Sequence, residues 1–172
     1  MNQTDTLQLR WYAIHVRSRH EFQIFDRLKL KGIEAFLPTV EKLRKWKDRK
    51  KLVTFPLFPG YLFVRITEDA RNMLEVLKIR GVVNMICTLP HTPTPIPDEQ
   101  INMLKKLVEN SDTLDPYPYL TEGQNVRIIK GPMTGIEGIL VEKLDKHFLV
   151  LSVDVLRQGV ALTINAADVE KT

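Results

Sequence analysis

The residues whose types most clearly suggest a binding function are a run of cations around one tryptophan. Residues 42–51 read KLRKWKDRKK, with seven basic side chains, one acidic side chain and Trp46 near the centre. Cations pair with phosphates and an indole ring can stack on a base, so this composition is typical of a nucleic-acid contact. A solvated loop that only adds solubility is the alternative. The candidate contact residues are Lys45, Trp46, Lys47 and Arg49.

Catalytic and metal-binding chemistry is not indicated by the rest of the chain. The four histidines are scattered and there is one cysteine. We find no nucleophile–base pattern, no metal-ligand spacing and no phosphate-binding loop in the sequence. We therefore expect no catalytic residues, no metal and no cofactor. Cys87 lies in a strand-like run and is expected to be a buried, inert thiol.

The most aromatic stretch is residues 53–66, VTFPLFPGYLFVRI. It is predicted to form two strands that meet at a bend, because proline fixes φ and glycine accepts positive φ. Its aromatic side chains are Phe55, Phe58, Tyr61 and Phe63. Since side chains alternate between the faces of a sheet, one core cannot bury them all. We therefore expect some of this aromatic surface to remain uncovered; the alternative is a central strand that helices cover on both faces.

The elements around this stretch predict an α+β fold. We expect further strands at residues 11–16, 34–40 and 82–87, and helices that begin near residues 19, 68 and 98. Ser18 and Glu21 have the spacing of a capping box at the first helix, and Gly32 is suited to its C-terminal end. Thr67 can cap the second helix, whose apolar stripe comprises Ala70, Met73, Leu74 and Leu77.

The chain is predicted to contain two domains. Residues 110–120 are rich in proline and polar residues and have no period, which indicates a linker. The segment that follows has short strand-like runs separated by glycines, which favours a small closed β-barrel over helices. The prediction is a mixed or antiparallel sheet flanked by helices at residues 10–110, a linker at 111–120 and a β-barrel at 121–172.

Charge and hydropathy narrow the function classes. The 172 residues carry a net charge of +4. The first 120 residues hold 19 Lys and Arg against 14 Asp and Glu, whereas the remainder holds 6 against 7. An anionic partner is therefore expected for the first domain. No apolar run approaches the ~20 residues of a membrane span, so we expect a cytoplasmic protein without a membrane partner.

Two sets of motifs resemble a known family. WYAIHV at residues 11–16, FPLFPGYLFV at 55–64 and IPDE at 96–99 resemble the N-terminal (NGN) domain of the NusG family of transcription elongation and antitermination factors. GQNVRIIKGPMTGIEGILV at residues 123–141 resembles the KOW module that follows it in this family. The sequences of the aromatic stretch and of the basic run resemble those of the specialised, operon-directed paralogues more than those of the housekeeping member. These paralogues often serve polysaccharide operons.

The resemblance implies a non-enzymatic, monomeric factor that binds RNA polymerase. In this family the first domain binds the clamp helices of the largest RNA polymerase subunit and reaches the other large subunit across the polymerase cleft. Binding suppresses pausing or termination. The residues carried over to the polymerase-binding pocket are His15, Phe58, Pro59, Tyr61 and Phe63. For each aromatic residue the alternative is a place in the core. A ribosome-associated or RNA-binding KOW protein is the alternative function.

The resemblance also suggests two further contacts. Some paralogues read the non-template DNA strand, and the candidates by position are Arg17, Arg19, His20 and Arg80, with solvated surface as the alternative. In housekeeping members an aromatic residue in the KOW domain helps to bind a ribosomal protein or Rho. The matching residues, Leu156, Arg157 and Gln158, include no aromatic residue, so these two partners stay open.

Overall fold

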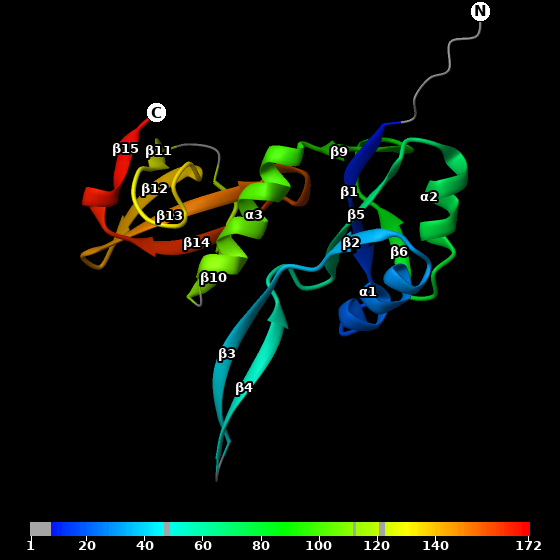
Figure 1. Ribbon diagram of the computed structural model, residues 1–172, viewed down its shortest axis with the longest axis horizontal. Coiled ribbons are helices and arrows are strands. Elements are labelled where there is room, and N and C mark those ends of the chain that lie inside the picture. The colour runs from blue at the N-terminus through cyan, green and yellow to red at the C-terminus, as the bar shows by residue number, and fades with distance from the viewer. Residues whose placement is uncertain (1–7, 47–48, 112, 121–122) are drawn as a thin grey trace, which may run out of the picture. The chain divides into compact units, whose positions relative to one another are not determined.

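The computed structural model describes residues 8–46, 49–111, 113–120 and 123–172. Backbone contacts divide the chain into two compact units. The first unit contains the described residues up to Leu37 and Pro59–Ile101, and the second contains Pro38–Phe58 and Asn102–Thr172. Helices accompany an antiparallel sheet in the first unit and strands dominate the second, which confirms the predicted α+β class (Figure 1). Independent folding of residues 10–110 and 121–172 stays a prediction.

An antiparallel sheet forms the centre of the first unit. Its order is β2-β5-β1-β6, and β9 also pairs with β1. The strands are β1 (Leu9–Val16), β2 (Glu34–Phe36), β5 (Tyr61–Thr67), β6 (Val82–Met85) and β9 (Pro95–Ile96). β7 (Cys87–Leu89) and β8 (Thr92–Pro93) form a separate pair in which all of β7 is exposed. The prediction of a buried Cys87 was therefore wrong, because its strand lies outside the main sheet.

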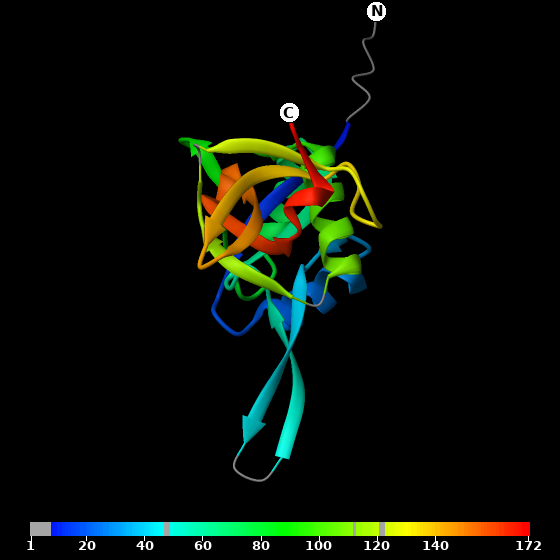
Figure 2. The same cartoon turned by 90° about the vertical axis from the view of Figure 1, so that its left-hand side faces the viewer.

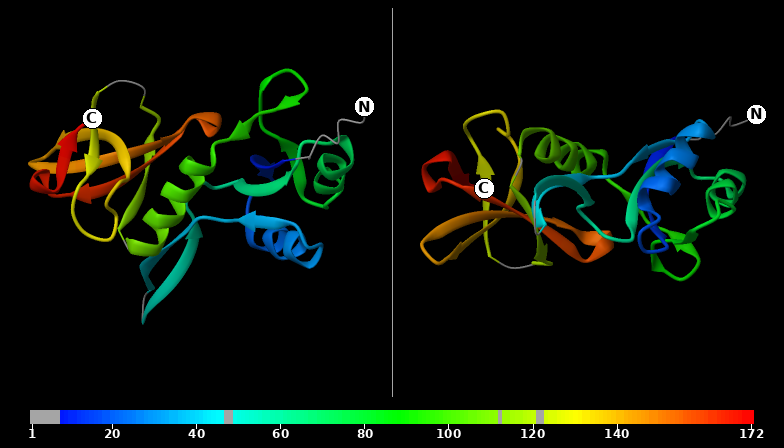
Figure 3. Two further views of the ribbon diagram at one scale, coloured as in Figure 1. Left: turned by 45° about the horizontal axis from the view of Figure 1, so that its top comes forward. Right: turned by 90° about the horizontal axis from the view of Figure 1, so that it is seen from below.

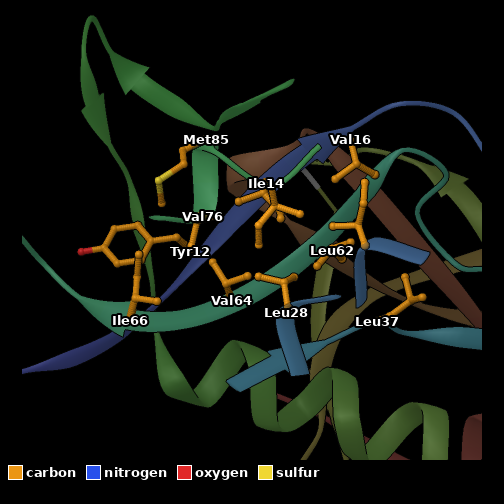
Figure 4. Close-up of a cluster of buried hydrophobic side chains, with 12 residues drawn as sticks. Tyr12, Ile14, Val16, Leu28, Leu37, Leu62, Val64, Ile66, Val76 and Met85 are labelled. Carbon is orange, nitrogen blue, oxygen red and sulfur yellow. The ribbon is translucent and has the colours of Figure 1, made fainter. Parts of the chain in front are cut away.

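One face of the main sheet is covered by α1 (Glu21–Leu30) and α2 (Ala70–Leu77), whose inner side chains pack with those of the strands. Figure 4 shows side chains of this core on β1 and β5, with Leu28 of α1 and Val76 of α2 among them. Alternate residues of the two central strands point into this core, because successive side chains of a strand face opposite ways. The core side chains are Tyr12, Ile14 and Val16 of β1, Leu62, Val64 and Ile66 of β5, Ile24 and Leu28 of α1, Val76 of α2, and Leu37, Ile79 and Met85. This arrangement leaves the opposite residues of β1 and β5 on a second face.

The end of α1 follows its sequence signal. Gly32 has φ +73°, the left-handed conformation expected of a C-terminal glycine. Its N–H donates to the Lys29 carbonyl at 2.9 Å, and the N–H of Ile33 donates to the Leu28 carbonyl at 3.0 Å. These two bonds form a Schellman motif, so the prediction for this end is confirmed.

The start of α1 departs from its prediction. His20, rather than Ser18, occupies the N-cap position, and no side-chain hydrogen bond caps the helix there. Glu21 does not close a capping box, because its carboxylate accepts the N–H of Gly60 instead. A partner from far along the chain has replaced the local one.

Helix α2 also differs from its prediction in detail. Its N-cap is Asp69, whose carboxylate accepts the Asn72 N–H at 2.9 Å and the Thr67 hydroxyl proton. Leu74 and Leu77 of the predicted stripe are 50% and 41% exposed. Met73 of the predicted stripe packs against the core as expected, and Val76 and, beyond the end of the helix, Ile79 make the other core contacts.

The second unit combines a two-stranded ribbon with a curved six-stranded sheet. The ribbon is β3 (Thr39–Trp46) and β4 (Arg49–Pro56), which pair in antiparallel register. The sheet has the order β10-β14-β13-β12-β11-β15 and curls around its own core (Figures 2 and 3). Its strands are β10 (Leu114–Pro118), β11 (Gln124–Ile128), β12 (Glu137–Lys143), β13 (Lys146–Val153), β14 (Gln158–Ile164) and β15 (Val169–Lys171).

Helix α3 (Asp98–Asn110) begins in the first unit and continues in the second. Ile101, Leu104 and Leu107 are buried along it, as its apolar spacing predicts. Among the helices of the described residues, none combines the length and apolar content that crossing a membrane requires.

The predicted linker is partly a strand. Leu114–Pro118 form β10, which pairs with β14 in antiparallel register, and Leu114 is buried. Because β10 is an edge strand, its prolines can lie where no ladder hydrogen bond needs an N–H. The expected linker therefore contains a strand that pairs with β14, and its role as a linker between domains stays a prediction.

Candidate docking and nucleic-acid surfaces

The residues of β1 and β5 that point away from the core form an aromatic row, which we call the second face. His15 lies opposite Tyr61, and Phe63 lies between Ala13 on β1 and Phe36 on β2. The ring centroids of His15 and Tyr61 are 5.2 Å apart, and those of Phe36 and Phe63 are 6.0 Å apart. Strand register thus places Ala13 beside Phe63, 50 positions apart in the sequence, and His15 beside Tyr61, 46 positions apart.

Exposure separates the predicted pocket residues into two groups. Phe58 and Phe63 are buried, with 1% and 0% exposed, so the expectation that Phe58 is uncovered was wrong. His15 and Tyr61 are half-buried and Pro59 is exposed. These three residues remain available to a partner in this structure. Whether any of the five binds polymerase stays a prediction.

A basic hollow lies at the start of α1. Its volume is about 290 Å³, and it is lined by Arg17, His20, Gln23, Arg27, Arg80 and Gly81. Three of the four predicted DNA-contacting residues therefore lie together, although they come from separate parts of the sequence. Arg19 does not line the hollow; it is exposed beside it in the turn after β1, with φ +64°.

Backbone contacts hold the walls of the hollow. The Arg17 N–H donates to the Gly81 carbonyl at 2.8 Å, which joins the end of β1 to the start of β6. The Arg27 guanidinium donates from Nη1 to the Arg80 carbonyl at 2.7 Å. The lining residues include three guanidinium groups and no carboxylate, so the hollow suits an anion such as a phosphodiester.

The sequence prediction missed Gln23 and Arg27. A signal was present, because residues 20, 23 and 27 have the spacing of one helical face. Their direction toward Arg80 depends on how α1 packs on the sheet, which the local sequence does not contain.

The ribbon presents cations along its length. Lys45, Arg49 and their basic neighbours on β3 and β4 are exposed. Lys45 lies directly opposite Lys50, and Arg44 lies opposite Lys51. Like charges in such positions destabilise a strand pair, so a polyanion would relieve the ribbon's own repulsion. Of the other predicted residues, Lys47 and the side chain of Trp46 lie outside the described part of the chain.

The segment between β13 and β14, which leads into Gln158, lies against an aromatic residue from another part of the chain. Leu156 is buried, Gln158 is half-buried, and Arg157 is exposed with φ +54°. The Arg157 guanidinium lies 4.7 Å from the ring centroid of Tyr119, which follows β10. The Tyr119 hydroxyl donates to Asp154 at 2.9 Å, and this hydrogen bond raises the pKa of the phenol.

Comparison with known proteins gives these surfaces a family context. The family model described as "Transcription termination factor nusG" matches residues 9–105, which is more than half of the chain. The chain belongs to the NusG family. NusG-family proteins are transcription factors without enzymatic activity, and they act with RNA polymerase in transcription.

Individual relatives in the NusG family are distant but aligned over nearly their whole length. NusG of Buchnera aphidicola is 27% identical, over 94% of this chain and 96% of the relative. NusG of Pseudomonas aeruginosa is 25% identical, over 94% and 98%. NusG of Escherichia coli K12 is 26% identical, over 94% of this chain and 96% of the relative. All three relatives are described as "Transcription termination/antitermination protein NusG".

A solved structure of Thermotoga maritima NusG shares the fold. Its TM-score is 0.56 at 21% identity, over 95% of this chain and 97% of that one. This likeness shows the fold alone. It agrees with a sheet-and-helix unit followed by a strand-rich unit.

Proposed function

We propose that this protein is a transcription elongation and antitermination factor that docks on RNA polymerase through the second face. The partner is the tip of the clamp helices of the largest subunit, and the same unit reaches the other large subunit across the cleft. Docking suppresses pausing or termination. The observation that carries the proposal is the half-buried His15–Tyr61 pair beside exposed Pro59, in a chain of the NusG family.

The chemistry of this surface suits a helical partner. Tyrosine combines an apolar ring with a polar tip and is enriched among residues that dominate binding energy. A half-buried ring loses little conformational freedom when a partner covers it. Phe63, buried beside Phe36, contributes by keeping the sheet beneath this surface rigid rather than by direct contact. We assign direct contact to His15, Pro59 and Tyr61.

The basic hollow is proposed to contact the non-template DNA strand in the transcription bubble. Its guanidinium groups suit phosphodiester oxygens, and Gln23 adds a side chain that can both donate and accept. Arg27 and Gln23 join the predicted Arg17, His20 and Arg80, while Arg19 lies beside them. The ribbon cations are proposed to contact nucleic-acid backbone. These features fit a cytoplasmic, monomeric, operon-directed paralogue of the polysaccharide-operon type.

The barrel is proposed to receive a second protein at Leu156–Gln158, with a ribosomal protein and Rho as the candidates. Tyr119 supports this proposal, since it places an aromatic ring against a loop that has none of its own. Arg157 is exposed and Tyr119 is half-buried, so both can be reached by a partner at that surface.

Binding of the full-length protein to core RNA polymerase tests the proposal. Tyr61→Ala is expected to weaken binding about fivefold or more, because truncating a central aromatic contact costs more than ~1 kcal/mol. Phe22→Ala is the matched control: it removes a 43%-exposed ring of α1 in the same unit, outside the second face, and should leave binding unchanged.

Two results would contradict the proposal. One is full polymerase affinity in a folded Tyr61→Ala variant. The other is a wild-type protein that sediments with ribosomal subunits and not with polymerase, which would favour the ribosome-associated alternative.

A further inference from the structure

Glu21 is a charged side chain in a place where charge is costly. Among the described residues it is the charged side chain classed as buried, with 4% exposed. A buried carboxylate is strongly unfavourable unless it is hydrogen-bonded. Its position in the first turn of α1 provides part of the compensation, because the helix dipole favours negative charge there. The rest must come from a specific partner.

That partner is the backbone of the turn between β4 and β5. The Gly60 N–H donates to Oε1 of Glu21 at 2.8 Å in a buried hydrogen bond. The Gly60 carbonyl accepts the N–H of Val16 at 2.8 Å. Gly60 has φ +83°, which suits glycine far better than other residues. Both polar groups of this residue are therefore held by side chain or backbone from elsewhere in the first unit.

The fixed turn lies within the surface to which we assign docking. Gly60 is flanked by exposed Pro59 and half-buried Tyr61. A Cβ placed on Gly60 would lie 3.6 Å from Cδ2 of His15, so the glycine lies against the imidazole ring. His15 in turn packs on Tyr61. Any movement of the Gly60 peptide would shift all three proposed contact residues.

We infer that Glu21 is a positioning residue for the docking surface: its carboxylate holds the Pro59–Gly60 turn in the shape that the partner meets. The inference rests on the proposed function. Without the acceptor, the Gly60 N–H is left buried and unpaired, and the turn relaxes to reach water. Binding energy must then be used to order the turn again, which lowers affinity.

The test compares three replacements of Glu21 in the full-length protein. Glu21→Gln keeps an acceptor oxygen at the same reach and should retain polymerase affinity. Glu21→Leu removes the acceptor and should weaken affinity about tenfold, the equivalent of one lost buried hydrogen bond. Glu21→Asp keeps the charge but withdraws it by one methylene, and should also weaken affinity. Asp26→Ala, which removes an exposed carboxylate of the same helix, is the control for charge and should have no effect.

Two measurements separate positioning from general stability. Val76→Ala weakens the core away from the turn, and at an equal loss of melting temperature it should retain affinity where Glu21→Leu does not. Amide hydrogen exchange should accelerate at Gly60 in the Leu and Asp variants. In a double-mutant cycle, Glu21→Leu should cost less on a Tyr61→Ala background than alone, because both act through one surface.

The outcomes are distinguishable from those that test the proposed function. Faster exchange at Gly60 with wild-type affinity would overturn the positioning role and leave docking intact. Equal losses of affinity in Glu21→Leu and Val76→Ala would reduce Glu21 to a stabilising residue and overturn the role as well. Absence of polymerase binding by the wild-type protein would overturn both inferences, while Gly60 exchange would still report the hydrogen bond itself.

Discussion

Removing two cations from the basic hollow should change how nucleic-acid binding depends on salt. Arg17→Gln combined with Arg80→Gln removes two of the three guanidinium groups while the backbone contacts of both residues can remain. Arg27 is kept, because its side chain holds the Arg80 carbonyl. The expected result is weaker binding to single-stranded DNA and a shallower salt dependence.

The magnitude follows from counterion release. Each phosphate contact on a single strand contributes about 0.7 to the slope of log affinity against log salt, so two contacts contribute about 1.4. Between about 50 and 200 mM salt, a slope of that size corresponds to roughly sevenfold in affinity. The wild-type protein should therefore lose about sevenfold more affinity than the variant over this range.

Fluorescence anisotropy with a labelled single-stranded oligonucleotide, titrated with full-length protein at several salt concentrations, measures both slopes. The control is Lys29→Gln combined with Arg71→Gln, which removes the same charge from exposed positions of α1 and α2 outside the hollow. If the hollow variant and the control have the same slope, net charge explains the binding and the hollow is not a nucleic-acid site.

Three other expectations can be checked directly. Gly138→Ala should lower the melting temperature, because the added Cβ would lie 2.6 Å from the Val150 carbonyl oxygen on the neighbouring strand; an unchanged melting curve would show that the two strands can separate without cost. Asp69→Ala should destabilise α2. The pKa of Asp69 is lowered, chiefly by the Thr67 hydroxyl, so the stability that Asp69 contributes is present above its unfolded pKa of ~3.9 and is lost as pH falls through the folded pKa. Equal acid unfolding of wild type and Asp69→Ala would contradict this. Lys45→Glu places a negative charge directly opposite Lys50, so it should stabilise the ribbon while weakening nucleic-acid binding. A variant with both a more stable ribbon and tighter nucleic-acid binding would exclude the ribbon as a contact.

Several elements could be predicted from local sequence. The ribbon follows from two strand-like segments around a basic turn, and the end of α1 follows from Gly32, which accepts the left-handed conformation that closes a helix. The strands of residues 123–172 follow from their short apolar runs and glycines. Each of these predictions depends on residues a few positions apart, and the backbone energies that decide them are equally local.

The predictions that were wrong concern burial, which depends on residues distant in the sequence. Phe58 and Tyr61 are three positions apart in the same aromatic motif, yet one is buried and the other is half-exposed. Cys87 is exposed because its strand pairs outside the main sheet. Residue type sets how favourable burial would be, but the packing of other elements decides whether it occurs.

The candidate sites show the same division. Sequence alone indicated the aromatic motif and the basic run, and the family resemblance indicated Arg17, Arg19, His20 and Arg80, of which all but Arg19 line the hollow. The tertiary structure alone brought Arg27 to the Arg80 carbonyl and Glu21 to the Gly60 N–H, across 53 and 39 positions respectively. A side chain of one helix can satisfy either a local or a remote backbone group, and the choice is made by which group is left buried without a partner when the sheet and helices pack.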